Sequence, residues 1–175
     1  MDNCAEKIFF TPPGRILFLS ALFFIGISAL NAQPALPPRS LTVTATQGLH
    51  FGTFALSGST GSVTVGWDGS RSATGNIVLL SIFPTPQPAI FEIKLCQGRN
   101  VIITFSNSTI LTGNQGGSLQ LDIGPTDQGG NNAIFAAGND CNFITPLRVG
   151  GTLHIPLNAL PGTYTGSFEI TFHQE

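Results

Sequence analysis

The residues best suited to bind a metal ion form an oxygen-rich stretch in the second half of the chain. Carboxylate and amide oxygens are the ligands that calcium prefers, but their spacing here lacks the alternate positions and closing glutamate of a calcium loop. Aspartate and asparagine also dominate ordinary turns, because they tolerate left-handed backbone. We therefore expect turns, with no metal and no cofactor. The residues concerned are Asp122, Asp127, Asn131, Asn132, Asn139 and Asp140.

The other titratable residues give no catalytic pattern. His50, His154 and His173 are far apart in sequence, and none has the two-residue spacing that aligns two ligands on one strand face. Glu92 and Glu169 lie in alternating segments, where an outward, solvated position explains them. Neither the Gly-x-Ser-x-Gly motif nor a phosphate-binding loop occurs, and the glycine pairs, Gly150-Gly151 among them, are interpreted as turns. We expect the protein not to be an enzyme.

The composition excludes two further classes. Among 175 residues there are seven Lys or Arg and nine Asp or Glu, so 9% are charged and the net charge is −2. Nucleic-acid binding requires clustered positive charge, which this chain lacks. The hydrophobic fraction of 42% is too high for an acidic disordered tail. A compact, β-rich domain remains.

The first 32 residues predict a secretory signal peptide, expected as a helix. Residues 16–30 are apolar and uncharged, with Lys7 and Arg15 before them and Ala32 after them. A retained membrane anchor is the alternative, but crossing a bilayer takes about 20 apolar residues. We expect cleavage after Ala32 and a secreted protein in the periplasm, on the outer surface or outside the cell. Only the leader would then contact the membrane.

The remaining chain predicts a Pro-rich lead-in over residues 33–40 and a single domain over residues 41–175. Export would expose Cys96 and Cys141 to an oxidising compartment, which favours a disulfide between them. Two buried free thiols are the alternative. A zinc site is disfavoured, because neither cysteine has a second Cys or a His at ligand spacing.

Alternation of apolar and polar residues dominates the domain. Short alternating segments separated by Gly, Asn, Asp and Pro predict eight or nine strands and no helix. The continuous apolar run at residues 77–82 predicts a strand that is buried on both faces or crosses the core. Many short strands of this kind predict an all-β, antiparallel β-sandwich. The segments are 41–45, 51–54, 63–67, 77–82, 91–95, 101–105, 119–123, 153–157 and 164–172.

Two aromatic residues are candidates for a ligand platform. Trp67 opens the turn at Asp68-Gly69, where its ring could stack on a sugar, and Tyr164 is the other aromatic with a polar group. Trp67 could equally cap the core, as large aromatics at strand ends often do. The outward positions of the strands carry Thr and Ser, which suits either self-association or an ordinary secreted surface.

Three stretches resemble the bacterial family of exported domains of unknown function numbered 4402, which is similar in pattern to spore-coat-U and chaperone-usher pilin-like domains. The resemblance implies an immunoglobulin-like sandwich in the periplasm or on the bacterial surface, without enzymatic activity. The stretches are 41–54, 61–80 and 148–172, and their most specific elements are Phe51-Gly52, Asp68-Gly69-Ser70-Arg71 and Pro161-Gly162-Thr163-Tyr164.

The similarity to pilins also implies strand donation, in which one subunit completes the sheet of another. Residues 33–46 are the candidate donor, with Leu41, Val43 and Ala45 as alternating anchors. The same segment could instead complete its own sheet. The cysteine positions and the C-terminus, Phe172-His173-Gln174-Glu175, depart from the pilin pattern, which has a bridge between early strands and a penultimate tyrosine.

From these observations we expect a secreted, non-enzymatic structural or adhesive protein of the bacterial envelope, of the kind that forms fimbria-like assemblies. A monomeric carbohydrate- or protein-binding module is the alternative. The expected partners are further copies, other envelope proteins or a glycan, and not nucleic acid.

Overall fold

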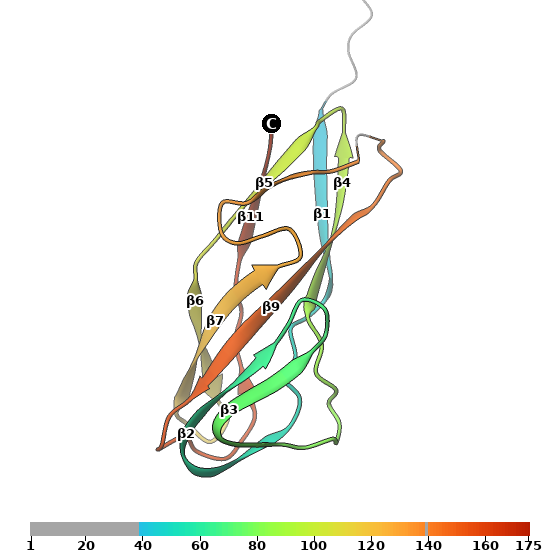
Figure 1. Cartoon of the computed structure of the whole chain (residues 1–175). Helices are drawn as coiled ribbons and strands as arrows, with labels where there is room; N and C mark the ends of the chain where they lie inside the picture. The colour runs from blue at the N-terminus through green and yellow to red at the C-terminus, as the bar shows by residue number, and fades with distance from the viewer. Residues whose placement is uncertain (1–38, 139) are drawn as a thin grey trace, which may run out of the picture. The chain divides into compact units, whose positions relative to one another are not determined.

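The computed structural model describes residues 39–138 and 140–175. The expected signal peptide and residues 33–38 of the lead-in lie outside the described residues. The described part is all-β and contains no helix, so it has none long and apolar enough to span a membrane. Its strands are β1 (Ser40–Gln47), β2 (Phe54–Val65), β3 (Arg71–Leu79), β4 (Ala89–Cys96), β5 (Asn100–Phe105), β6 (Ser108–Gly113), β7 (Ser118–Thr126), β8 (Ile134–Ala136), β9 (Thr145–Ile155), β10 (Tyr164–Thr165) and β11 (Ile170–Gln174) (Figure 1).

The strands form two antiparallel sheets, which confirms the expected all-β sandwich. The large sheet has eight strands and is organised around β9. The first half of β9 pairs with β4, and its second half pairs with β2 on that edge and with β7 on the other. β1 extends the sheet beyond β4, β3 extends it beyond β2, and β6 and β10 extend it beyond β7. The small sheet has the order β11-β5-β8.

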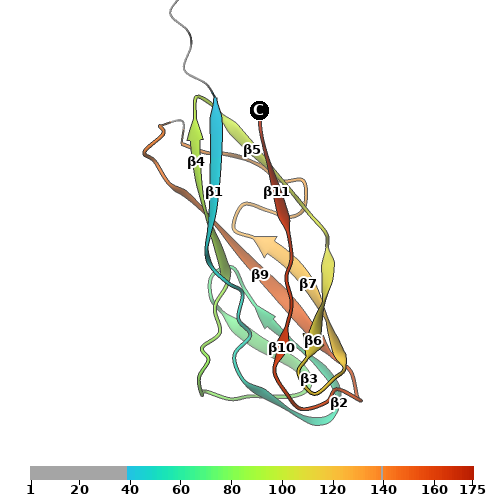
Figure 2. The ribbon, with the colours of Figure 1, turned by 180° about the vertical axis from the view of Figure 1, so that it is seen from behind.

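The hydrophobic core lies between the two sheets, as the alternating pattern predicts. Along each central strand every second side chain is buried, and the intervening ones face outward. The core is therefore filled from both layers (Figures 1 and 2). Its fully buried side chains are Val63, Val65, Ile93, Leu95, Val101, Ile103, Leu119, Leu147 and Val149.

Two sequence interpretations are wrong in detail. Residues 77–82 are not a strand buried on both faces, because β3 ends at Leu79 and pairs only with β2 within the described residues. Val78 is therefore 48% exposed, and Ile82, beyond the strand, is 59% exposed. The described residues also form eleven strands instead of eight or nine. The polar β6 and the short β8 carry little apolar alternation, the segment 164–172 divides into β10 and β11, and 51–54 is not a separate strand because β2 begins at Phe54.

Gly150 and Gly151 lie in the middle of β9 and form no turn. A Cβ on Gly150 would approach the Val65 carbonyl oxygen to 2.5 Å and the Trp67 nitrogen to 2.9 Å. A Cβ on Gly151 would lie 3.0 Å from the Asp122 oxygen. The pair is thus explained by the close approach of β2 and β7 to β9.

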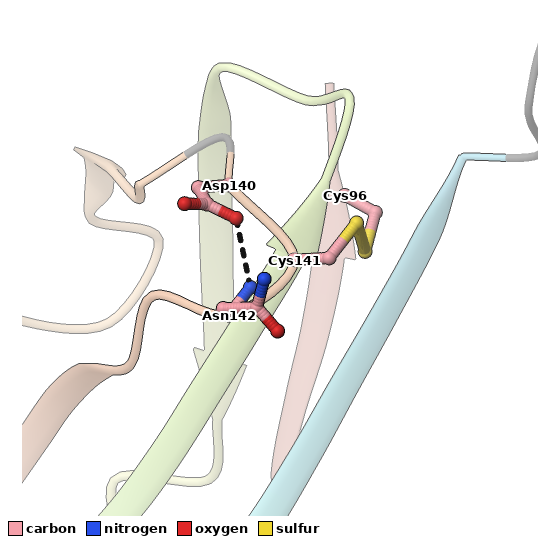
Figure 3. The surroundings of a disulfide bond; sticks show 4 residues. All are labelled: Cys96, Asp140, Cys141 and Asn142. Atoms are coloured by element: carbon pink, nitrogen blue, oxygen red, sulfur yellow. Dashed lines mark hydrogen bonds between the residues drawn. A yellow bond between two sulfur atoms is a disulfide. The ribbon is translucent and has the colours of Figure 1, made fainter.

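The disulfide between Cys96 and Cys141 is confirmed (Figure 3). It joins the end of β4 to the loop that precedes β9. In that loop the Asn142 N–H donates to an Asp140 carboxylate oxygen at 3.0 Å, which fixes the turn around Cys141. The bond is compatible with a location outside the cytoplasm.

Removal of this disulfide should lower the free energy of unfolding by about 4 kcal/mol, because the crosslink constrains a long segment of the unfolded chain. The sequence separation of its cysteines is 45. We expect this loss in urea unfolding of Cys96→Ala/Cys141→Ala, and an equal loss for the unaltered protein in reductant. A change below about 1 kcal/mol would contradict the loop-entropy account.

Candidate functional site

Each of the two sheets ends in a strand that is hydrogen-bonded along only one edge among the described residues, and these two strands are neighbours. Within the described residues β1 pairs only with β4, and β11 pairs only with β5. β1 and β11 lie side by side, but no ladder of hydrogen bonds joins them (Figures 1 and 2). We call the facing edges of β1 and β11 the seam.

The main chain of β11 presents unused hydrogen-bonding groups to the seam. The Glu175 N–H donates to the Asn100 oxygen at 3.1 Å, so the odd-numbered residues of β11 bond to β5. Because an antiparallel ladder alternates, the N–H and C=O groups of Ile170, Phe172 and Gln174 point away from β5. An edge with free N–H and C=O groups is a template for another strand.

Apolar side chains at the seam are only partly covered. Phe91 of β4 contacts Phe168 and Phe172, with ring centroids 6.3 Å and 5.8 Å apart. All three rings are half-buried and pack against the core, as do Leu41 and Val43 of β1. The sandwich is therefore less complete here than in its interior, where Phe105 and Phe135 are only 8% and 7% exposed.

The side chain of Gln174, in β11, also has a polar atom without a hydrogen-bond partner among the described residues. The Gln174 side-chain oxygen is buried, and no described residue donates a hydrogen bond to it. Gln174 belongs to the same set of residues whose main chain faces the seam. A buried acceptor without a donor is unfavourable.

The candidate donor residues lie on their own chain in this structure. Leu41, Val43 and Ala45 pair with Leu95, Ile93 and Phe91 of β4, respectively. Leu41 and Val43 are half-buried, whereas Ala45 is exposed. Ser40, expected in the lead-in, is the first residue of β1. In the single chain this segment thus completes its own large sheet.

The two aromatic residues of the candidate ligand platform are placed apart. Trp67 is 42% exposed and follows β2 at the end where Val65 pairs with Gly151. Tyr164 is half-buried, pairs with Gly113, and donates its hydroxyl to the Leu160 oxygen at 2.7 Å. β2 pairs with one edge of β9, whereas β10 lies beyond β7 and β6 on the other side of β9, so the two rings do not form one platform.

A polar cluster that the sequence did not indicate lies on the outer face of the large sheet. The register of β7 and β9 brings Gln120 opposite His154. His154 Nε2 and Gln120 Nε2 lie 2.7 Å and 3.0 Å from the two oxygens of the Asp122 carboxylate. The hydrogen bonds from Gln120 and then His154 lower the pKa of Asp122 below its usual value of 3.8. The cluster lies beside an open hollow of about 570 Å³, which His154, Ser62 and Ile110 help to line.

The oxygen-rich stretch is used for turns and local contacts. Asp127 accepts hydrogen bonds from the Arg148 main chain at 2.9 Å and from its guanidinium at 3.5 Å. The Asn131 side-chain oxygen accepts from the Phe105 N–H at 2.9 Å, and Asn132 has a positive φ of 65°. Asn139 lies outside the described residues. Elsewhere, in 39–138 and 140–175, no group of three His, Cys, Asp or Glu residues is arranged to hold a metal ion.

The carboxyl group of Asp122 should titrate below pH 3.8, the usual value for aspartate. Because its folded pKa is lowered, its stabilising effect is present above the unfolded pKa and is lost as the pH falls through the folded pKa. We expect Gln120→Ala and His154→Ala each to raise the NMR titration midpoint of Asp122. Unchanged midpoints in both variants would contradict this origin of the shift.

The comparisons with known proteins give one match. A family model described as "Domain of unknown function (DUF4402)" matches residues 41–173. Neither the curated proteins nor the solved structures contain a match to the chain. The family match covers β1 through most of β11, and so includes the seam and the polar cluster. The chain therefore belongs to the DUF4402 family.

Proposed function

We propose that the protein is an exported, non-enzymatic structural subunit of the bacterial envelope that associates with further copies by taking up an extended strand at the seam. One observation carries this proposal: the open edge of β11 lies beside half-buried aromatic side chains. The disulfide supports an extracytoplasmic location, and the apolar run before Ala32 supports export.

An added strand would satisfy both features of the seam at once. Its main chain would pair with the free N–H and C=O groups of Ile170, Phe172 and Gln174. Its inward side chains would cover Phe91 and Phe172, removing apolar surface from water at roughly 25 cal/mol per Å². The chain offers such a strand in residues 33–46 of a second copy, where Leu41, Val43 and Ala45 alternate with polar residues, and to donate it that copy would release its β1 from β4.

A labelled synthetic peptide of residues 33–46 should bind the exported chain. Ile170→Pro/Gln174→Pro should weaken this binding about 30-fold, because it removes two edge-facing N–H donors, each contributing about 1 kcal/mol. Neither N–H is used in the ladder to β5, so β11 should remain in place. Fluorescence anisotropy measures the affinity, and thermal unfolding verifies the fold.

The matched control is Ile170→Ala/Gln174→Ala, which shortens the same side chains but keeps both N–H groups. It should bind the peptide within a few-fold of the unaltered chain. A peptide with Leu41, Val43 and Ala45 replaced by Thr should not bind. The proposal fails if the original peptide does not bind, or if the proline and alanine variants bind it equally.

A second candidate function is the recognition of a neutral sugar by the polar cluster. The observation in its favour is the juxtaposition of a carboxylate, an imidazole and an amide at Asp122, His154 and Gln120. Planar polar side chains of this kind bond well to sugar hydroxyls, and the adjacent Ile110 is 57% exposed.

If this second function holds, a panel of neutral oligosaccharides should contain ligands whose binding is lost in Gln120→Ala/His154→Ala. Trp67→Ala should leave that binding unchanged, because Trp67 lies at the other end of the β2 ladder. Glycan-array fluorescence followed by calorimetry measures the effect. A loss in Trp67→Ala alone would point to Trp67, and binding that neither variant alters would exclude the cluster.

A further inference from the structure

β1 is held to the domain by the ladder along one of its edges. This ladder to β4 runs from the pair Ser40–Cys96 to the pair Gln47–Ile90, and no other described strand bonds to β1. β4 is bonded on its other edge to β9, and β11 is bonded to β5. Release of β1 would therefore break no other ladder among the described residues. Local opening of one edge strand costs less free energy than global unfolding.

The glycine that follows β1 is not required by the position in which β1 is paired. A Cβ on Gly48 would meet no heavy atom within 4 Å, and the φ of Gly48 is not positive. Neither close packing nor a left-handed backbone explains this glycine. Glycine gives the main chain more conformational freedom than any other residue. Gly48 is thus suited to act as a hinge for β1.

The chain beyond Gly48 is anchored to the domain. His50 and Gln87 exchange two main-chain hydrogen bonds of 2.8 Å and 2.9 Å. The next residue, Phe51, is 8% exposed and belongs to the core. Rotation of the main chain at Gly48 would therefore move β1 and leave the rest of the domain in place.

Two glutamine side chains hold the hinge in the paired position. Gln47 Nε2 donates to the Pro88 oxygen at 2.7 Å, and Gln87 Nε2 donates to the Gly48 oxygen at 3.2 Å. We call the first of these bonds the Gln47 clasp. Gln47 is half-buried and lies just outside the candidate donor, residues 33–46. The clasp can therefore be removed without changing the donor sequence.

The disulfide supports the part of β4 that only β1 covers. β9 pairs with residues 89–93 of β4, whereas residues 94–96 pair with β1 alone among the described residues. With β1 released, the bond from Cys96 to Cys141 would still tie this end of β4 to the loop before β9. The edge that receives β1 is thus kept in place while β1 is away.

We propose that the pairing of β1 with its own β4 is an autoinhibitory contact, which withholds the donor strand until the hinge at Gly48 opens. The inference rests on the strand uptake proposed above and specifies how that uptake is controlled. Once released, the eight residues of β1 reach about 26 Å from the hinge, at about 3.3 Å per residue. The affinity between copies is reduced in proportion to the fraction of copies in which β1 is open.

A crosslink that holds β1 on β4 should abolish donation and spare acceptance. Thr44 and Glu92 lie opposite each other on the two strands, so Thr44→Cys/Glu92→Cys should form a disulfide between them. The oxidised, exported variant should bind the peptide of residues 33–46 with unaltered affinity. In sedimentation velocity it should stay monomeric at concentrations at which the unaltered chain associates. Peptide mapping verifies the new bond and the native one.

The matched control for the crosslink is Ser62→Cys/Thr74→Cys, which joins β2 to β3 and does not involve β1. The two hydroxyl oxygens lie 2.7 Å apart across a registered pair, so a disulfide should form there as well. This control should associate and bind the peptide as the unaltered chain does.

Removal of the Gln47 clasp should have the opposite effect. Gln47→Ala should tighten self-association about five-fold, the factor that corresponds to one hydrogen bond of about 1 kcal/mol. Amide hydrogen exchange should accelerate in β1 by the same factor and stay unchanged in β9. Gln120→Ala is the matched control, because it removes a glutamine hydrogen bond on β7 and should alter neither quantity.

The outcomes separate this inference from the proposed function. If the crosslinked chain associates normally, or if Gln47→Ala changes neither association nor exchange in β1, the autoinhibitory contact is wrong. Peptide binding at the seam then still supports the proposed function. If no chain associates, Gln47→Ala included, both the contact and the proposed association are wrong. Failure of the peptide to bind would overturn uptake at the seam, and the inference with it.

Discussion

Pairing of the main chain along β9 is the constraint on which the rest of the structure depends. β9 is bonded along both edges, to β4 and β2 on one and to β7 on the other. Four of its side chains, Leu147, Val149, Leu153 and Ile155, belong to the buried core. A strand so enclosed must satisfy every polar main-chain group through its neighbours. The close approach of those neighbours in turn leaves no room for a side chain at Gly150 and little at Gly151.

The seam shows the opposite situation. β1 and β11 are each bonded along one edge, and the apolar side chains beneath them are only half-buried. At β9 the main chain is hydrogen-bonded along both edges and the apolar side chains are covered. At the seam one edge of each strand is unpaired and the apolar side chains are only partly covered. The proposed uptake of a further strand at the seam rests on this difference.

Two of the short sequence elements that carry the resemblance to the family, Phe51-Gly52 and Asp68-Gly69-Ser70-Arg71, support the exposed loop that carries Phe83. Arg71 and Gly52 are distant from Phe83 in sequence, yet both lie at the base of its loop and fix its course. The disulfide gives the loop that carries Phe143 a comparable anchor at the end of β4. In both cases an exposed apolar side chain lies on a loop that is itself restrained.

The sequence by itself predicted the fold class, most of the main strands and the favoured pairing of Cys96 with Cys141, because alternation is a local property and the expected export favours a disulfide. It did not determine β6, whose polar residues carry no alternation, or the role of Gly150 and Gly151, which depends on strands far away in sequence. The pairing of Asp122 with His154 likewise follows from the register of β7 and β9, and the seam from which strand edges remain unpaired. Only the tertiary structure decides these features, because register and edge position are properties of the whole sheet.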